Sequence, residues 1–396
     1  MSAVSSELAN GQKATSAATT LRVTFLLGGL DVGGAEMQAI AMAGEMQRLG
    51  HSVELIALAD GPLRALAYKH HLVLHVLPRV AGLALAAVPQ LTRLVSSSRT
   101  QVLYAFLEVQ WLLALATASR LPAVARPRVV LGLRSSNYDA RPTGLKARAV
   151  RTLTRFCTHT ADLLIANSRA GLDSYRTIVS SAPAGLVVPN GVEVERFAPS
   201  STARVRWRRD WSIPLDATIV GHVGRLDPVK DHELLLRAFA LACADDESCH
   251  LVCVGHGEPS RALALGQLAE SLGIANRVHL VGGYLETSTL YPAFDVLALT
   301  SRREGFPNVV AEAMSCGVPA VVTDTGASAD IVAGFGEVVP VGAIGAFADG
   351  LSRLLSRRSV TLSQDSRSHI ATHFSLNTAA SRTATALRSL FLVNTE

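Results

Sequence analysis

Aromatic residues make up only 5% of this 396-residue chain, and charged residues only 17%. No block of lysine and arginine is interleaved with aromatic residues, which argues against a nucleic-acid partner. Apolar residues, at 49%, are too abundant for a disordered chain. The net charge of +5 is modest and favours an anionic partner, such as a nucleotide, a phospholipid surface or a lipid diphosphate.

Patterns of metal binding and membrane crossing are missing as well. The five cysteines show no CxxC spacing, so we interpret them as buried thiols in a reducing compartment, and no D-x-D metal motif is present. The most apolar stretches, 81–91 and 111–118, are far shorter than the roughly 20 residues of a membrane-spanning helix. Residues 1–20 lack the apolar core of a signal peptide and are predicted to be a disordered lead. We therefore expect a cytoplasmic protein.

The pattern of the first segments predicts a parallel sheet. Residues 21–27, LRVTFLL, form the continuous apolar run of a strand that is buried on both faces. The glycine-rich loop 28–34 follows, and residues 35–49 show helical spacing up to Gly50. The next segment, HSVELIAL, has the pattern of a second strand. A strand–loop–helix–strand unit of this kind predicts parallel strands with a right-handed crossover.

The same alternation continues along the chain and starts again after the turn-rich segment 189–199. We predict an α/β protein of two doubly wound, Rossmann-like domains that face a central cleft. The first domain is expected over 21–190 and the second over 191–375, with the strand at PAVVT as the last of its core. A final helix in 376–396 is expected to pack on one of the two domains, and the N-terminal domain is one candidate.

The segment GRLDPVK, residues 224–230, carries two cations at the end of a predicted strand. In open α/β sheets ligands bind at the carboxyl ends of strands, where the next helix offers free N–H groups and a partial positive charge. Arg225 can form paired hydrogen bonds with a phosphate, and Lys230 adds a point charge beside it. The pair would neutralise a pyrophosphate leaving group. The alternative is a surface loop whose cations are only solvated.

The segment EGFPNVVAE, residues 304–312, also runs from a predicted strand into a helix. Glu304 is expected in the loop that faces the cleft, and Glu312 in the second turn of the helix. The two carboxylates would accept hydrogen bonds from sugar and ribose hydroxyls, and Gly305 would let the backbone approach the ligand closely. The alternative is that Glu304 only complements a helix dipole and Glu312 is a solvated helix residue.

The loop 28–36, GGLDVGGAE, places adjacent glycines directly before a helix. Such glycines suit a backbone that passes close to a ligand. The loop is not the dinucleotide fingerprint, because no G-x-G-x-x-G is present, and this argues against a nicotinamide oxidoreductase. A tight turn with a structural role explains the glycines equally well.

Together these motifs resemble glycosyltransferase family 4, a retaining family with the GT-B fold. They are GGAE in the first loop, then VVPNGVEVERF, VGRLDPVKD and EGFPNVVAEAMSCGVPAVVTDTGA, in the family's usual order. The resemblance covers residues 21–390, and the last two motifs are the specific ones.

The resemblance implies a role for each matching residue. Arg225 and Lys230 would bind the donor diphosphate and Glu304 would lie against the transferred sugar, which makes these three the expected catalytic residues. Glu312 would bind the ribose hydroxyls, and residues 281–284 would border the base. The donor-binding residues implied in this way are Gly33, Gly34, Gly224, Arg225, Lys230, Gly305, Phe306, Pro307, Asn308 and Glu312.

The family's chemistry needs no bound metal, so neither metal ligands nor a cofactor are expected. A nucleoside diphosphate sugar, and a UDP-sugar rather than a GDP-sugar, would serve as co-substrate. The sequence departs from the family in the first domain, where members often carry a histidine beside the transferred sugar. The two expected strand ends, 104–108 and 133–137, contain none. Arg134 or Asn137 is expected to take its place on the acceptor or sugar side.

One predicted helix carries regularly spaced arginines. Arg148, Arg151 and Arg155 share one face by their spacing and alternate with apolar residues such as Leu153 and Phe156. This face would dock on anionic lipid at the inner face of the membrane or guide a lipid diphosphate acceptor. The alternative, which we favour from the sequence, is the solvated outer face of a helix whose other side is buried.

The expected function is the retaining transfer of a hexose-type sugar from a nucleoside diphosphate sugar to an acceptor hydroxyl. A growing polysaccharide or lipopolysaccharide, as a glycan or lipid-linked acceptor, would receive it. Two alternatives share the architecture. One is a sugar-nucleotide epimerase, which needs no acceptor, and the other is a protein that binds nucleotide sugars without catalysis.

Overall fold

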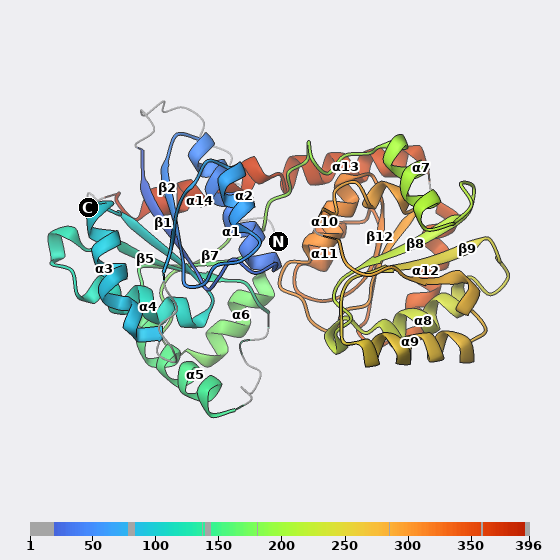
Figure 1. Ribbon diagram of the computed structural model, residues 1–396, viewed down its shortest axis with the longest axis horizontal. Helices are drawn as coiled ribbons and strands as arrows, with labels where there is room; N and C mark the ends of the chain where they lie inside the picture. Colours follow the sequence, from blue (N-terminus) through green and yellow to red (C-terminus); the bar gives the residue numbers. More distant parts are fainter. Residues whose placement is uncertain are drawn as a thin grey trace, which may run out of the picture.

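The computed structural model describes residues 20–77, 84–136, 138, 144–179, 181–284, 286–357 and 359–392. Figure 1 shows two lobes side by side, each built around one sheet. The predicted lead 1–20 falls almost entirely outside the described residues. Within the described residues, no helix combines the length and the apolar character that a membrane crossing requires.

The first lobe holds a seven-stranded sheet in the order β3-β2-β1-β4-β5-β6-β7, and every neighbouring pair is parallel. Its strands are β1 (Arg22–Leu27), β2 (Ser52–Ala57), β3 (Val73–Val76), β4 (Val102–Phe106), β5 (Arg128–Leu133), β6 (Leu163–Ala166) and β7 (Gly185–Val187). Five of the six residues in β1 are buried, because helices cover both faces of the sheet.

Two groups of helices cover the first sheet, one on each face. One face packs on α1 (Gly34–Arg48), α2 (Arg64–Lys69) and α14 (Leu376–Ser389). The other packs on α3 (Val88–Ser97), α4 (Glu108–Ser119) and α6 (Arg169–Ile178), while α5 (Leu145–Cys157) lies against α4. Sequence analysis did not predict α6, which connects β6 to β7.

The second lobe holds a six-stranded parallel sheet in the order β10-β9-β8-β11-β12-β13. Its strands are β8 (Thr218–Val223), β9 (Cys249–Val254), β10 (Val278–Leu280), β11 (Val296–Leu299), β12 (Ala320–Thr323) and β13 (Glu337–Val339). The prediction that the strand at PAVVT is the last one was wrong, because β13 extends the sheet beyond it.

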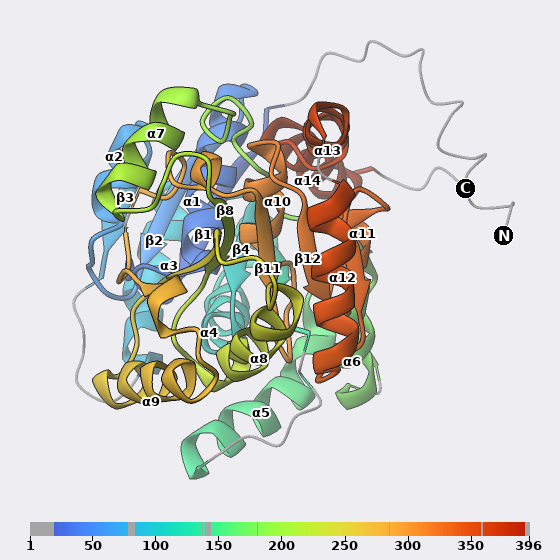
Figure 2. The ribbon, with the colours of Figure 1, turned by 90° about the vertical axis from the view of Figure 1, so that its right-hand side faces the viewer.

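Helices cover both faces of the second sheet as well. One face packs on α7 (Ser201–Asp210), α10 (Asn308–Ser315), α11 (Ser328–Val332) and α13 (Val360–His373), and the other on α8 (His232–Ala242), α9 (Pro259–Ser271) and α12 (Ile344–Arg357). Figure 2 turns the second lobe toward the viewer, and Figure 1 shows α11 on the side of this lobe that faces the first lobe. The predicted α/β class, with two doubly wound domains, is confirmed.

Two chain crossings join the lobes. The connection at Val192 runs parallel to the junction between α13 and α14, where its N–H donates to Phe374 and its carbonyl accepts from Leu376, both at 2.8 Å. After this junction α14 packs against α1, with Ala380 and Leu387 fully buried in the core of the first lobe. The last helix of the chain thus returns to the N-terminal sheet.

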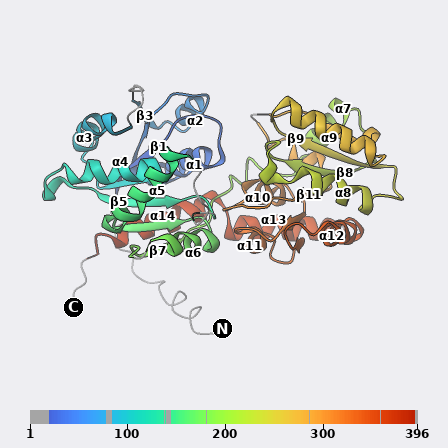
Figure 3. The same cartoon turned by 90° about the horizontal axis from the view of Figure 1, so that it is seen from below.

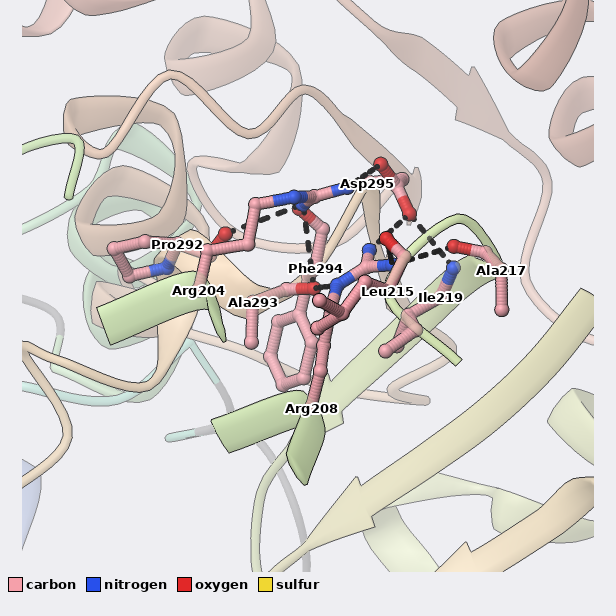
Figure 4. Close-up of polar contacts among 9 residues, drawn as sticks. All are labelled: Arg204, Arg208, Leu215, Ala217, Ile219, Pro292, Ala293, Phe294 and Asp295. Carbon is pink, nitrogen blue, oxygen red and sulfur yellow. Dashed lines mark hydrogen bonds and ion pairs between the residues drawn. The ribbon is translucent and has the colours of Figure 1, made fainter. Parts of the chain in front are cut away.

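A buried ion-pair network fixes the beginning of the second sheet (Figure 4). Arg208 of α7 is fully buried, and it donates to Asp295 at 2.7 Å and to the carbonyl of Ala217 at 2.6 Å. Arg204, one turn earlier, donates to the other carboxylate oxygen of Asp295 at 2.7 Å. Burial alone would raise the pKa of Asp295, but the Ile219 N–H and the two guanidinium groups outweigh it and lower that pKa. The network ties α7 to β8 and β11.

Replacing Asp295 by alanine should lower the free energy of unfolding by about 3–5 kcal/mol, because it leaves the buried charge of Arg208 without its partner. Urea unfolding followed by the fluorescence of Trp207 and Trp211, which lie in the same lobe, measures the loss. The control Asp210→Ala removes a solvent-exposed pair with Arg206 and should change stability by less than about 0.5 kcal/mol. Equal losses in both variants would contradict the account.

Candidate active site

The central neighbours of the second sheet, β8 and β11, are adjacent in space although β9 and β10 separate them in sequence. Their chain connections leave in opposite directions, so the loops after the two strands flank an open crevice at the carboxyl edge of the sheet. Crevices of this kind are where doubly wound sheets bind ligands. The loop after β8 carries Lys230, and the loop after β11 carries Glu304.

Lys230 and Glu304 form an ion pair across this crevice, with the ammonium 2.7 Å from the carboxylate. Both side chains are largely shielded, at 20% and 12% exposure. Shielding from water strengthens a charge contact relative to one on the open surface. The two predicted site residues are therefore in direct contact.

The backbone around Lys230 is held from both sides. Asp231, in a left-handed conformation (φ 51°), caps the start of α8 by accepting from the Leu234 N–H at 3.3 Å. Its other carboxylate oxygen accepts from Arg302 at 2.8 Å. The Thr300 hydroxyl donates to the carbonyl of Lys230 at 2.8 Å. These bonds fasten the β8 loop to the β11 loop and fix the direction of the lysine.

Arg225 lies at the outer side of the same loop. Its side chain is 80% exposed and stands 3.8 Å from Asp227. Among the described residues no side-chain hydrogen bond of at most 3.5 Å holds the guanidinium, which leaves it accessible to an anion above the loop. Lys230 is thus the shielded cation of the crevice and Arg225 the exposed one.

Two glycines allow neighbouring segments to approach the loops that carry Lys230 and Glu304. A Cβ atom on Gly255 would overlap the carbonyl oxygen of Gly224. Gly326, which has a positive φ of 59°, would in the same way overlap the carbonyls of Glu304 and Gly305. Gly255, directly after β9, and Gly326, in the loop after β12, therefore let the chain pass close to the two expected ligand loops. These two glycines were not among the predicted site residues.

Glu312 lies in the second turn of α10, as predicted, but apart from the Lys230–Glu304 pair. Tyr291 donates its hydroxyl to the Glu312 carboxylate at 2.6 Å. Burial raises the pKa of Glu312 to about 7, although the bond from Tyr291 and the charge of Arg196 lower it. Its interpretation as a merely solvated helix residue is therefore wrong.

A cavity of about 300 Å³ opens between the lobes in front of Glu312. The first lobe contributes α1, with Met37 and Gln38, and His70 after α2. The interlobe connection contributes Glu193 and Arg196, which are joined at 2.7 Å. Asn308 and Glu286 of the second lobe complete the wall. The predicted central cleft is present at this place.

The loop from Gly305 to Asn308 touches the first lobe directly. The Asn190 side chain donates to that of Asn308 at 2.9 Å. A Cβ on Gly34, at the start of α1, would come within 3.3 Å of the same Asn308 side chain. Gly305 faces Asn167, whose buried amide oxygen has no hydrogen-bond partner among the described residues. The expected sugar-binding loop is thus enclosed by both lobes.

Arg134 is held inside the first lobe. Its guanidinium donates to the Tyr104 hydroxyl at 2.7 Å and to the Asn190 side chain at 3.1 Å, and it lies over the Phe106 ring at 4.8 Å. Through Asn190 it reaches the loop at Asn308. The other first-lobe candidate, Asn137, lies outside the described residues. Sequence analysis missed Asn167 and Asn190. Asn167 directly follows the apolar strand β6, which was an available signal, whereas Asn190 lies three residues after β7, within the family motif VVPNGVEVERF.

Comparisons with known proteins agree with this geometry. The profile of the family described as glycosyl transferases group 1 matches residues 203–370, and that of glycosyltransferase family 4 matches residues 32–196. The chain belongs to this family of glycosyltransferases. The two matches correspond to the two lobes, so the family resemblance seen in the sequence is confirmed.

Curated relatives of this glycosyltransferase include D-inositol 3-phosphate glycosyltransferases. The protein from Saccharomonospora viridis is 33% identical over 53% of this chain and 51% of its own length. The one from Corynebacterium glutamicum is 27% identical over 85% of this chain and 82% of its own. The chain therefore spans about half the length of the first relative and most of the second.

Solved structures establish the fold of this glycosyltransferase as GT-B. HepE from Anabaena, solved in complex with UDP, superposes with a TM-score of 0.77 at 23% identity, covering 93% of this chain and 100% of that one. WaaG, a glycosyltransferase involved in lipopolysaccharide biosynthesis, superposes with a TM-score of 0.70 at 18% identity, covering 92% and 99%.

The raised pKa of Glu312 gives stability a defined pH dependence. As the pH rises, the unfolded chain loses this proton near its usual pKa of about 4.3, while the folded protein keeps it until about pH 7. Stability is therefore fullest below the unfolded pKa and falls as the pH rises to 7. Glu312→Gln, which retains an uncharged acceptor, should raise the melting temperature at pH 8 and change it little at pH 4.5.

The control for this prediction is Glu270→Gln on the exposed side of α9, which should leave the melting temperature unchanged at both pH values. Thermal unfolding followed by circular dichroism measures both variants. A shift of Glu312→Gln that is the same at pH 4.5 and pH 8 would show that the carboxyl titrates at its ordinary pKa.

Proposed function

We propose that this glycosyltransferase transfers a hexose-type unit from a UDP-sugar to an acceptor hydroxyl, with retention at the anomeric carbon. The observation that carries the proposal is the Lys230–Glu304 pair at the switch point of the second sheet. A cation there would neutralise the donor diphosphate, while the carboxylate beside it would accept hydrogen bonds from sugar hydroxyls.

The proposed transition state resembles an oxocarbenium ion, with negative charge building on the departing diphosphate. Lys230 and Arg225 would stabilise that charge in a cleft from which the lobes exclude water. The first-lobe groups nearest Gly305 are the Arg134 carbonyl and the Asn167 amide, and neither is a carboxylate that would act as nucleophile. We therefore favour front-face attack, in which the leaving phosphate accepts the proton of the acceptor hydroxyl. Glu304 would position the sugar.

The remaining donor contacts are proposed from the family resemblance. Glu312 would bind the ribose hydroxyls at the wall of the interlobe cavity, with residues 281–284 bordering the base. Gly33 and Gly34 would close over the phosphates from the start of α1, and Gly224 lets the β8 loop run beneath them. The backbone through Phe306 and Pro307 would contact the sugar. HepE was also solved with UDP-glucose, which supports a UDP-sugar donor.

The acceptor is proposed from the relatives. The name of the curated relatives includes D-inositol 3-phosphate, a phosphorylated polyol. WaaG, a structural neighbour, is involved in lipopolysaccharide biosynthesis. We propose a glycan or lipid-linked acceptor in the synthesis of cell-surface polysaccharide, reached from the cytoplasmic side. We also propose chemistry without a metal ion, since Lys230 and Arg225 supply the positive charge. Among the described residues, no group of three His, Cys, Asp or Glu side chains is arranged to hold one.

A donor screen tests the proposed function. The protein is incubated with uridine, guanosine and adenosine diphosphate sugars, with and without a panel of acceptors that includes inositol 3-phosphate, and free nucleoside diphosphate is measured. Release of UDP that requires an acceptor and persists in EDTA is the expected result. Conversion of the donor without an acceptor would indicate an epimerase, binding without conversion a non-catalytic protein, and activity that EDTA abolishes and magnesium restores a metal-dependent enzyme.

Replacing Lys230 or Arg225 by alanine should lower turnover about 100-fold or more, the scale of losing one preorganised charge contact in a transition state. Arg237→Ala, an exposed arginine on α8 outside the crevice, is the matched control and should keep wild-type turnover. Steady-state kinetics with the donor found in the screen measures all three variants, and melting temperatures verify that each is folded. Near-normal turnover in both site variants would refute the assignment.

A further inference from the structure

The helix α5 presents apolar side chains to solvent and keeps polar ones inside. Leu145, Leu153 and Phe156 are 84%, 51% and 72% exposed. On the opposite side Thr154 is fully buried. A surface helix of a globular protein ordinarily turns its apolar stripe toward the core. In α5 the inner face holds Thr154 with the half-buried Val150 and Cys157, while the large side chains of Leu145, Leu153 and Phe156 lie outside.

By helical spacing, the exposed residues Leu145, Thr152, Leu153 and Phe156 lie along one side of α5, here called the stripe. Leu145, Thr152 and Phe156 stand at positions i, i+7 and i+11, and Leu153 follows beside them. Arg148 and Arg155, seven residues apart, lie along one edge of this stripe, and both are exposed. Figures 1 and 2 show α5 at the bottom of the first lobe, and Figure 3 views the molecule from that side. The exposed fractions of its side chains place the stripe on the solvent side of the helix.

Arg151 does not belong to this exposed face. Its guanidinium donates to Glu108 of α4 at 2.7 Å and to the carbonyl of Tyr138. The prediction that Arg148, Arg151 and Arg155 share one outward face was therefore wrong for Arg151, which anchors α5 to the lobe. The alternative of a solvated outer face agrees with the exposure of Arg148 and Arg155, but that face is apolar along its centre.

We propose that α5 is a membrane-docking helix that lies in the plane of a bilayer containing anionic lipids. Leu145, Leu153 and Phe156 would enter the boundary between headgroups and acyl chains, while Arg148 and Arg155 would contact the lipid phosphates. Each basic residue near an anionic surface strengthens binding by about fivefold. This docking does not depend on the proposed transfer reaction.

Charge and size favour a bilayer over a second copy of the chain. Two copies packed antiparallel through this stripe would bring their arginine edges together, where like charges repel. Three large apolar side chains on one 13-residue helix also fall far short of the roughly 800 Å² per partner of a stable protein interface. An anionic bilayer instead complements the arginines and accepts a small apolar wedge.

Vesicle sedimentation tests the proposal without donor or acceptor, so its outcome is independent of transferase activity. Wild-type protein should bind vesicles of 70% phosphatidylcholine and 30% phosphatidylglycerol, more weakly at 0.5 M salt, and bind pure phosphatidylcholine at least tenfold more weakly. The double variant Leu153→Ser/Phe156→Ser should lose at least tenfold in binding to the anionic vesicles. Arg148→Glu/Arg155→Glu should lose at least as much.

Two control variants make the same types of substitution, apolar to serine and arginine to glutamate, at exposed positions of the second lobe. Leu263→Ser, at a leucine that is 65% exposed on α9, and Arg237→Glu on α8 should bind like the wild type. Melting temperatures verify that every variant is folded. The proposal is overturned if wild-type protein ignores anionic vesicles or if the α5 variants bind as the controls do. Self-association of wild-type protein that Phe156→Ser abolishes would identify a second copy as the occupant instead.

Discussion

Parallel strands deliver their following loops to one edge of a sheet, and in the second lobe this constraint brings Lys230 and Glu304 together. The two residues are 74 positions apart, yet β8 and β11 are neighbours and their carboxyl ends meet. Because the chain leaves these strands in opposite directions, the two connections diverge and leave a crevice between the loops. A largely shielded ion pair is left there, next to the loop that contacts the other lobe. The fixed backbone beneath it, tied through Asp231 and Arg302, holds the cation where a diphosphate would bind.

The architecture was predictable because buried parallel strands are continuous apolar runs, as in β1 and β6, and the helices between them carry regular spacing. The two elements that were not predicted, β13 and α6, lack this pattern. β13 has only three residues, of which one is buried, and α6 begins with polar residues directly after a strand. The site loops were predictable for a different reason, since Arg225, Lys230 and Glu304 stand at strand ends within family motifs.

What sequence reasoning missed are properties that arise from contacts between distant segments. The pKa of Glu312 depends on burial against Tyr291, which lies on the turn before β11. The position of Arg134 depends on Tyr104 and Asn190, from a neighbouring strand and from the interlobe connection. On α5 the spacing of the arginines was visible, but which of them faces inward was decided by Glu108 on another helix.

We propose that the crevice at Lys230 is the diphosphate site of the donor. It lies beside the loop at Gly305, which contacts the first lobe. A crystal structure of the protein with UDP bound tests this claim most directly. We expect diphosphate oxygens within hydrogen-bond distance of the Lys230 ammonium and the Arg225 guanidinium, with the ribose at Glu312. A diphosphate that lies elsewhere, with the Lys230–Glu304 pair closed and untouched, would contradict it.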